Sequence, residues 1–216
     1  MYAAHQIAKC LSDPRQSNGE AILYLVRYLK NMCDLGLKFK PDPKKGFECY
    51  RDANFSRNWN KAFASVDHST AKSQSGWIIF YAGCPISWAS KLQSQVALST
   101  TEAEYIAMSQ SLCEVIPVMN LLQEMREQDY QVICTEPHMY CKIFEDNSGA
   151  LELARFPKLR PRTKHINVCY HHFCEHACKG LIKIFPIDTK DQIADALTKA
   201  LAQNDVQHHH RYMCGK

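Results

Sequence analysis

The chain has 216 residues, of which 46% are hydrophobic and 22% are charged, and its formal net charge is +4 at pH 7. This composition excludes a chain that is disordered throughout, and it provides enough apolar surface for a folded core. No run approaches the roughly 18 consecutive apolar residues of a membrane-spanning helix, so we expect no membrane partner. The mildly basic balance allows a polyanionic partner but does not require one.

The cysteines and the N-terminus predict the compartment. None of the eleven cysteines forms a CxxC pair, and the opening residues MYAAHQIAKC lack a basic segment followed by an apolar one. We therefore expect no disulfide framework and an intracellular protein, cytoplasmic or nuclear, that is not secreted. His172 and His176 stand at a spacing that can chelate zinc, but free thiols on a helix are the expected reading of residues 169–178.

The first 46 residues predict a helix followed by a short strand. Ser17 and Glu20 have the spacing of a capping box. Four apolar residues then follow on one helix face: Ile22, Leu25, Val26 and Leu29. Residues 35–39 alternate between apolar and other residues, which predicts a strand, and the prolines of residues 41–46 predict a turn.

Five later segments predict β-strands, because apolar residues alternate in them or form short continuous runs. These segments are residues 47–55, 76–81, 84–91, 139–145 and 181–186. Ala82 and Gly83 turn the chain between the second and the third segment, which predicts a hairpin. Residues 56–75 are polar and predict a loop.

Helical patterns occupy most of the remaining chain. Ser99 to Gln128 predicts one long helix with a capping box at its start, and Pro117 should kink or divide it. Further helices are expected over residues 147–154, from 163 or 164 to 179, and from Thr189 onward. The last has an apolar stripe consisting of Ile193, Leu197, Ala200 and Leu201. His208 to His210 would lie in a solvated basic tail, and the whole order favours a mixed α/β fold.

Four acidic residues lie where strands end or helices begin, and each has an ordinary structural explanation. They are Asp52, Glu104, Asp146 and Asp195. Asp52 could be an exposed strand residue, Asp146 a helix cap, Glu104 the capping partner of Thr101, and Asp195 a solvated helix residue. Together, however, they could meet at one edge of a sheet.

Such a group of carboxylates would need a counter-charge. Carboxylates within a few ångströms of one another raise each other's pKa, and a pair of Mg²⁺ ions removes that conflict. Two metals about 3.5–4 Å apart can activate a water and stabilise the leaving oxygen of a phosphodiester. The pattern therefore indicates phosphodiester chemistry, although composition alone would not establish it.

Six motifs in order resemble the signatures of the ribonuclease H domain of copia-type retrotransposon Pol polyproteins. They are DANF at 52–55, GCPISWASK at 83–91, ALSTTEAEYIA at 97–107, EDNSGA at 145–150, RTKHI at 162–166 and QIADALTK at 192–199. ALSTTEAEYIA is highly specific, and the order and spacing of the others reinforce it. Asn54 stands where the family often has a second acid, and no histidine occurs between Leu181 and Asp195.

The resemblance implies an α/β, ribonuclease H-like fold: a five-stranded mixed sheet flanked by helices, here with a short N-terminal helix–strand appendage. It implies endonucleolytic hydrolysis of the RNA strand of RNA–DNA hybrids with two Mg²⁺ ions, Mn²⁺ being an alternative. Asp52, Glu104, Asp146 and Asp195 would be the catalytic metal ligands. Glu102 competes with Glu104 for its role, but Glu102 can pair with Ser99 in the helix cap and so leave Glu104 free.

The resemblance also divides the chain and suggests its partners. Residues 1–46 would be the tail of the reverse transcriptase or its connection segment, residues 47–201 the ribonuclease H-like domain, and residues 202–216 a C-terminal tail. The expected partners are an RNA–DNA hybrid and a reverse transcriptase polymerase domain. No YxDD motif occurs in the chain, so no polymerase activity is expected.

A basic connector should contact nucleic acid, although a solvated loop is an equal alternative. Its residues are Arg160, Arg162, Lys164 and His165. A different hypothesis for the whole chain is a catalytically silent retrotransposon remnant that folds and at most binds nucleic acid.

Overall fold

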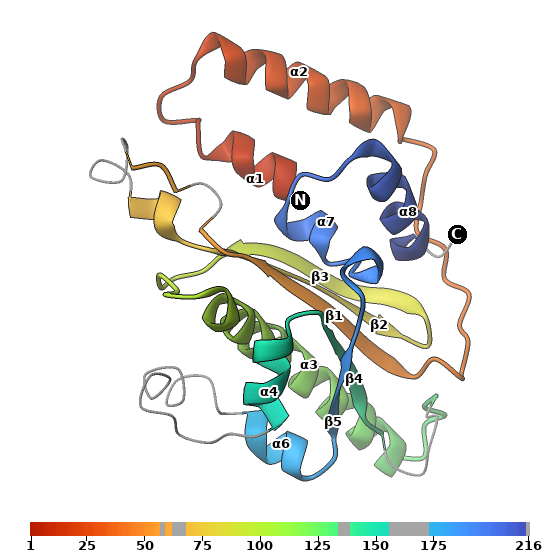
Figure 1. Ribbon diagram of the computed structural model, residues 1–216. Helices are drawn as coiled ribbons and strands as arrows, with labels where there is room; N and C mark the ends of the chain where they lie inside the picture. Colours follow the sequence, from red (N-terminus) through yellow and green to blue (C-terminus); the bar gives the residue numbers. More distant parts are fainter. Residues whose placement is uncertain (57–58, 62–67, 134–138, 156–172, 215–216) are drawn as a thin grey trace.

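The computed structural model describes residues 1–56, 59–61, 68–133, 139–155 and 173–214 (Figure 1). It contains one five-stranded sheet in the order β3-β2-β1-β4-β5. Helices α3 (Thr100–Glu127), α4 (Ser148–Arg155) and α6 (Cys174–Cys178) lie on one side of this sheet (Figure 1). Helices α1 (Tyr2–Ala8), α2 (Gln16–Asn31), α7 (Asp195–Thr198) and α8 (Gln203–Met213) lie on the other. The predicted five-stranded sheet with helices on both faces is therefore confirmed.

The sheet combines antiparallel and parallel pairs around β1 (Phe47–Asn54). β1 pairs antiparallel with β2 (Gln74–Tyr81), which forms a hairpin with β3 (Cys84–Leu92). On its other side, β1 runs parallel to β4 (Cys141–Glu145), and β4 runs parallel to β5 (Ile182–Pro186). This topology places the ends of β1 and β4 at the same edge of the sheet.

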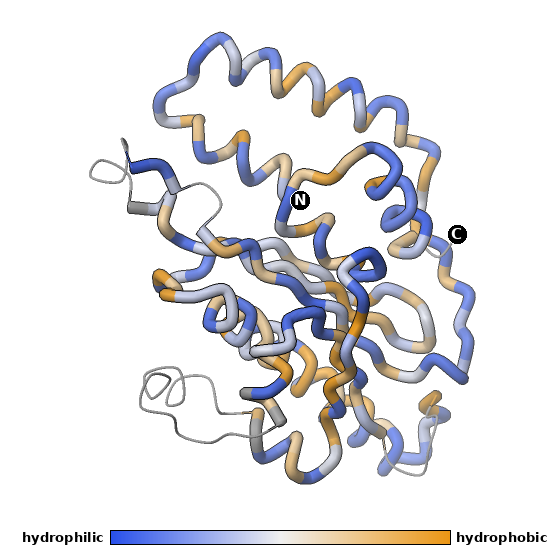
Figure 2. The backbone as a smooth tube through the Cα atoms, in the orientation of Figure 1, coloured by the Kyte–Doolittle hydropathy of each residue, from blue (hydrophilic) through white to orange (hydrophobic). Residues whose placement is uncertain are grey.

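Side chains of β1 alternate between two hydrophobic cores. Phe47 and Cys49 belong to the core that packs on α3, whereas Tyr50 belongs to the core that includes residues of α7. Hydrophobic segments accordingly run along the sheet and α3 in Figure 2. Because of the same alternation, Asp52 follows Tyr50 onto the α7 side and Arg51 follows Cys49 onto the α3 side.

Helix α3 (Thr100–Glu127) is continuous, so of the two predicted effects of Pro117, a kink or a division, the division does not occur. Pro117 is exposed, so the helical turn that the proline perturbs lies at the protein surface. By length and composition α3 could also cross a membrane, but half of its most apolar window is buried inside the protein. It packs against β1 and β2 as a core helix.

The N-terminal appendage contains two helices, α1 (Tyr2–Ala8) and α2 (Gln16–Asn31), and neither contains a buried residue. The N-cap of α2 is Arg15, whose amide donates to Asn18 Oδ1 at 2.7 Å, so the predicted start at Ser17 is wrong. Residues 35–39 are exposed and form no strand. They pass beside the C-terminus instead, where the Lys38 amide donates to the Cys214 carbonyl.

The C-terminal part differs most from the prediction. The expected last helix is divided into a 3-10 turn (Thr189–Asp191) and α7 (Asp195–Thr198), because the backbone leaves the helical conformation at Gln192. The chain becomes extended at Lys199, which ends α7. The expected solvated tail is helix α8 (Gln203–Met213), in which His209 is buried. α8 is held by Tyr212, whose ring contacts Tyr50 and Phe80 edge to face.

The shorter elements are a 3-10 helix (His68–Ala71), α4 (Ser148–Arg155) and α6 (Cys174–Cys178). α4 begins directly after the end of β4 and packs against α3. It therefore keeps the segment that contains Asp146 close to the N-terminal half of α3.

Candidate metal centre

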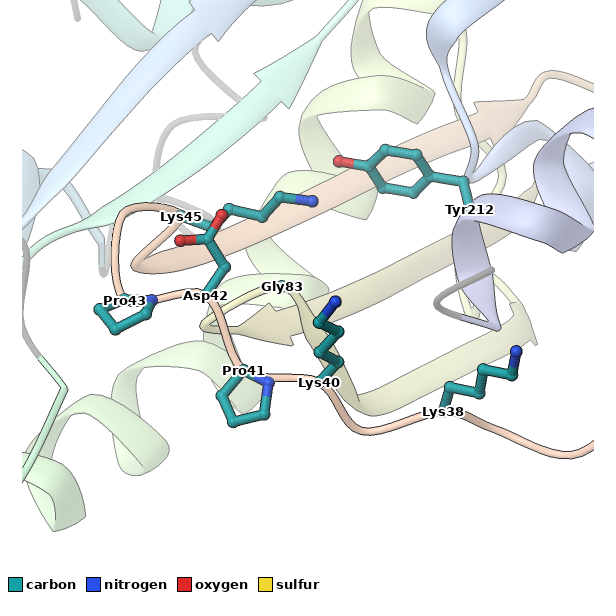
Figure 3. Close-up of a pocket in the computed structure, with 8 residues that line it drawn as sticks. All are labelled: Lys38, Lys40, Pro41, Asp42, Pro43, Lys45, Gly83 and Tyr212. Atoms are coloured by element: carbon teal, nitrogen blue, oxygen red, sulfur yellow. The ribbon is translucent and has the colours of Figure 1, made fainter.

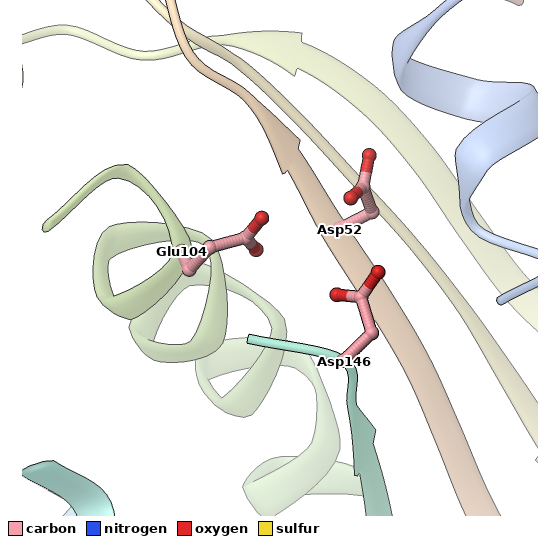
Figure 4. A group of neighbouring side chains, drawn as sticks. All are labelled: Asp52, Glu104 and Asp146. Carbon is pink, nitrogen blue, oxygen red and sulfur yellow. The ribbon is translucent and has the colours of Figure 1, made fainter. Parts of the chain in front are cut away.

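Three of the predicted carboxylates converge at one edge of the sheet. Asp52 lies near the end of β1, Asp146 follows β4, and Glu104 lies in the second turn of α3. Their ligand atoms all lie within 4.8 Å of one another (Figure 4). The parallel register explains the first two, because Tyr50 pairs with Phe144 two residues before each aspartate. Backbone pairing thus brings Asp52 and Asp146 together.

The two glutamates of TEAEY have different positions and partners. The Glu102 carboxylate accepts a hydrogen bond of 2.7 Å from the Leu98 amide, and its own amide donates to the Ser99 hydroxyl at 3.1 Å. Two residues correspond to about 200° of helix rotation, so Glu104 points away from that cap. The geometry therefore places Glu104, and not Glu102, in the carboxylate group.

Asp195 is connected to Asp52 by an ion pair that both residues form with Lys199. Lys199 Nζ lies 2.9 Å from Asp195 Oδ1 and 3.6 Å from Asp52 Oδ1. The Thr198 hydroxyl donates to the second oxygen of Asp52. Asp195 thus lies beside the three converging carboxylates, but an ammonium group stands between it and Asp52.

A glycine allows α7 to come this close to the sheet. Gly76 of β2 pairs with Asp52 in the antiparallel ladder. A Cβ atom at Gly76 would lie only 2.7 Å from the Thr198 methyl and 2.8 Å from Leu197 Cβ. Any side chain at this position would push α7 outward, and with it Asp195 and Lys199.

Burial and mutual repulsion raise the pKa values of two carboxyls. Burial, with smaller contributions from Asp52 and Asp146, raises the pKa of Glu104 to about 8, against the opposing charge of Arg51. Burial and Asp52 raise the pKa of Asp195 to about 7, although Lys199 acts in the other direction. Burial thus shifts both carboxyls toward their neutral forms, and their own cations offset this shift only in part.

Arg51 is a functional candidate that sequence reasoning missed. Its side chain is fully buried, and its Nη1 donates to the Glu104 carboxylate at 2.9 Å and to the Glu104 carbonyl at 2.6 Å. Its other terminal nitrogen contacts the buried Glu145 carboxylate. Arg51 thus fixes the position of Glu104. The sequence did contain a signal for Arg51. Alternation in the strand places it on the same face as the apolar Cys49, and a buried arginine requires a partner.

The donor set fits a hard divalent cation. Asp52, Glu104 and Asp146 offer only carboxylate oxygens, which Mg²⁺ and Mn²⁺ prefer. Burial raises the pKa of Glu104 to about 8, and a bound cation would favour its ionised form. The three residues therefore form a group that is compatible with a metal site.

A cavity of about 490 Å³ lies at the other end of β1 from Asp52. Lys38, Lys40 and Lys45 line it together with Tyr212, and the Lys45 ammonium lies 5.4 Å from the centre of the Tyr212 ring (Figure 3). Its lining contains none of the four predicted carboxylates. The predicted nucleic-acid-binding residues Arg160, Arg162, Lys164 and His165 lie outside the described residues.

Sequence comparison relates nearly the whole chain to transposon polyproteins. It is 34% identical over 207 residues to the retrovirus-related Pol polyprotein from transposon TNT 1-94 of Nicotiana tabacum, a match that covers 94% of this chain. It is 30% identical over 202 residues, again 94% of this chain, to that from transposon RE2 of Arabidopsis thaliana. The chain belongs to the retrovirus-related Pol polyproteins of transposons.

This membership confirms the resemblance stated from the motifs. The Pol relatives are much longer, because the chain spans 14% of the tobacco protein and 13% of the Arabidopsis one. A shorter match, 31% identical over 110 residues, covers 51% of this chain and 71% of the secreted RxLR effector protein 161 of Plasmopara viticola. No family model matches the chain.

Solved ribonucleases H are similar to this chain in structure. LC11-RNase H1 from compost aligns with a TM-score of 0.49 and 14% identity, over 71% of this chain and 92% of that one. The same enzyme in complex with an RNA/DNA hybrid aligns with a TM-score of 0.43 and 14% identity, over 70% and 93% of the two chains.

Proposed function

We propose that this chain hydrolyses the RNA strand of RNA–DNA hybrids during retrotransposon reverse transcription. The observation that carries the proposal is the convergence of Asp52, Glu104 and Asp146 from three elements that are distant in sequence. The ordered motifs and the Pol relatives support this reaction over other phosphodiester chemistry.

The proposed catalytic residues are Asp52, Glu104, Asp146 and Asp195. Asp52, Glu104 and Asp146 would hold one divalent cation, and Asp195 with Asp52 would hold a second. Mg²⁺ or Mn²⁺ held at these positions would supply water activation and stabilisation of the leaving oxygen. Arg51 orients Glu104 by donating a hydrogen bond to one of its carboxylate oxygens.

The proposed partners follow from the exposed surfaces and from the family. The RNA–DNA hybrid would lie over the carboxylate edge, with further phosphate contacts from Arg160, Arg162, Lys164 and His165. A reverse transcriptase polymerase domain would cover α2, where Val26 and Leu29 are each more than half exposed. We accordingly propose residues 1–46 as a connection segment, residues 47–201 as the nuclease domain, and an intracellular location.

A cleavage assay tests the proposal. Purified full-length chain would be incubated with Mg²⁺ and a hybrid labelled on its RNA strand, with single-stranded RNA and duplex DNA as controls. We expect endonucleolytic products from the hybrid only, and none after chelation of the metal. Binding of the hybrid without any cleavage in Mg²⁺ or Mn²⁺ would contradict the proposal and favour a silent remnant.

A further inference from the structure

The Lys199 ammonium lies between two of the acidic residues, Asp52 and Asp195, and forms an ion pair with each. Its Nζ lies 2.9 Å from Asp195 Oδ1 and 3.6 Å from Asp52 Oδ1. Both aspartate side chains are almost fully buried, with 7% and 2% of their surface exposed, respectively. The ammonium thus supplies the positive charge that holds these two carboxylates together.

Asp52 connects this ion pair to the three converging carboxylates. Oδ1 of Asp52 faces Lys199, and its Oδ2 accepts a hydrogen bond from the Thr198 hydroxyl. Asp52 also belongs to the group with Glu104 and Asp146. Asp52 therefore belongs both to the proposed cation site with Glu104 and Asp146 and to the ion pair with Lys199.

We propose that Lys199 is a displaceable internal cation that must leave the space between Asp52 and Asp195 before a divalent cation binds there. This inference rests on the proposed function, because it concerns the order in which the same site is filled. The position defined by Asp52, Glu104 and Asp146 fills first. The position between Asp52 and Asp195 fills second and more weakly, because Lys199 competes for it.

The surroundings of the two basic residues explain why Lys199 is the one that moves. Arg51 has no exposed side-chain surface and is held by Glu104 and Glu145. The Lys199 side chain is 28% exposed and lies just past the end of α7, where the backbone is already extended. A flexible, strongly hydrated ammonium at the rim can turn toward water, whereas a buried guanidinium between two carboxylates cannot.

Titration with Mn²⁺ alone tests this order of filling. Free Mn²⁺ would be measured by electron paramagnetic resonance in solutions of the full chain at pH 8. The variants are Lys199→Met, which removes the competing charge, Lys199→Arg, which keeps it, and Lys190→Met. Lys190 is exposed in the 3-10 turn, so its loss gives the same change in net charge as a matched control. Thermal unfolding would verify that each variant folds, and Lys199→Gln replaces Lys199→Met if the latter does not.

We expect one strong and one weak Mn²⁺ in the wild type. Lys199→Met should bind the second Mn²⁺ roughly tenfold more tightly, because the variant lacks the positive charge that repels this ion at a few ångströms. Lys190→Met should match the wild type, and Lys199→Arg should not bind the second ion more tightly. Unchanged or weaker second binding in Lys199→Met would overturn the inference while leaving the first site intact. If no protein binds Mn²⁺, the proposed metal centre fails and the inference fails with it.

Discussion

Glu102 and Glu104 offer an internal control at the scale of single residues. Glu104→Gln should lower hybrid cleavage by about a hundredfold or more, because an amide cannot supply the charge that a cation needs. Its free energy of unfolding should stay within about 1 kcal/mol of the wild type, since Gln keeps the shape of a carboxyl that is largely protonated at pH 7. Initial cleavage rates and urea unfolding measure the two effects.

Glu102→Gln should give the opposite result. Its role at the start of α3 is structural, because it accepts from the Leu98 amide. We expect near-normal cleavage and a loss of stability of about 0.5–1 kcal/mol. A large loss of cleavage in this variant, with activity retained in Glu104→Gln, would show that the two residues have been assigned the wrong way round.

The raised pKa of Glu104 predicts how stability depends on pH. The pKa is about 8 in the folded protein against an ordinary 4.5, so the folded state binds more protons between these values. The stability that this group contributes is complete below about pH 4.5 and is lost as the pH rises through 8. Asp195 acts in the same direction up to about pH 7.

Urea unfolding in a metal chelator should therefore show the wild type losing stability relative to Glu104→Gln between pH 6 and 9, because Gln does not titrate. Saturating Mg²⁺ should reduce this difference, since a bound cation favours the ionised carboxyl. A wild type that gains stability relative to Glu104→Gln over this range would contradict the assigned pKa shift.

Arg51 links the metal centre to the stability of the fold. Arg51→Met would leave the Glu145 carboxylate buried without its cation, and removing one partner of such a pair costs about 3–5 kcal/mol. Adding Glu145→Gln should recover part of that loss, because it removes one uncompensated charge. A urea double-mutant cycle measures the coupling, and strictly additive effects would refute the contact.

At the scale of elements, local periodicity correctly predicted the strands and α3, whose apolar residues lie on a buried face. The strands and α3 start and end within a few residues of their predicted bounds, because alternation and the Ser99 cap are local signals. Reliance on local periodicity also explains why the last helix was mispredicted. Its apolar stripe from Ile193 to Leu201 has helical spacing, yet the chain becomes extended at Lys199. No local pattern shows that turn.

The site shows the same division between local and remote signals. Motifs identified all four acidic residues, and the structure brings three of them within ligand distance of one another. Arg51 and Lys199 were missed because their partners are remote in sequence or are formed by the turn after α7. Glu104 lies on α3 and Glu145 at the end of β4, so only the assembled fold brings them to Arg51.

Helix α8 gives a direct test of an element that the sequence did not predict. Tyr212 packs its ring on Tyr50 and Phe80, and its hydroxyl lies 3.0 Å from that of Tyr50. Because the side chain is 38% exposed, Tyr212→Ala should cost about 2 kcal/mol, less than a fully buried aromatic residue. Gln207→Ala, on the exposed side of the same helix, should change little. Equal melting temperatures for the two variants would show that α8 does not stabilise the sheet.

At the scale of the whole molecule, the N-terminal appendage is the least firmly held part of the described chain. Neither α1 nor α2 contains a buried residue, and Ile22, Val26 and Leu29 of the predicted stripe are exposed. The connection to the sheet is better anchored, because the Asp42 amide donates to the Ala82 carbonyl at 2.8 Å and the Ala82 amide donates to the Gly46 carbonyl. Stability should therefore increase abruptly near the start of β1.

Limited proteolysis should reveal this boundary. We expect early cleavage within residues 9–40 and a resistant fragment that begins between Pro43 and Phe47, because local opening of α1 and α2 exposes little buried surface. The N-terminus of the fragment would be determined by mass spectrometry during a digestion series. Lys72 and Lys183, which lie beyond the boundary, provide internal reference sites that should be cleaved later. Uniform resistance from Met1 onward would show that the appendage is docked as firmly as the sheet, and it would remove the reason to expect a partner on α2.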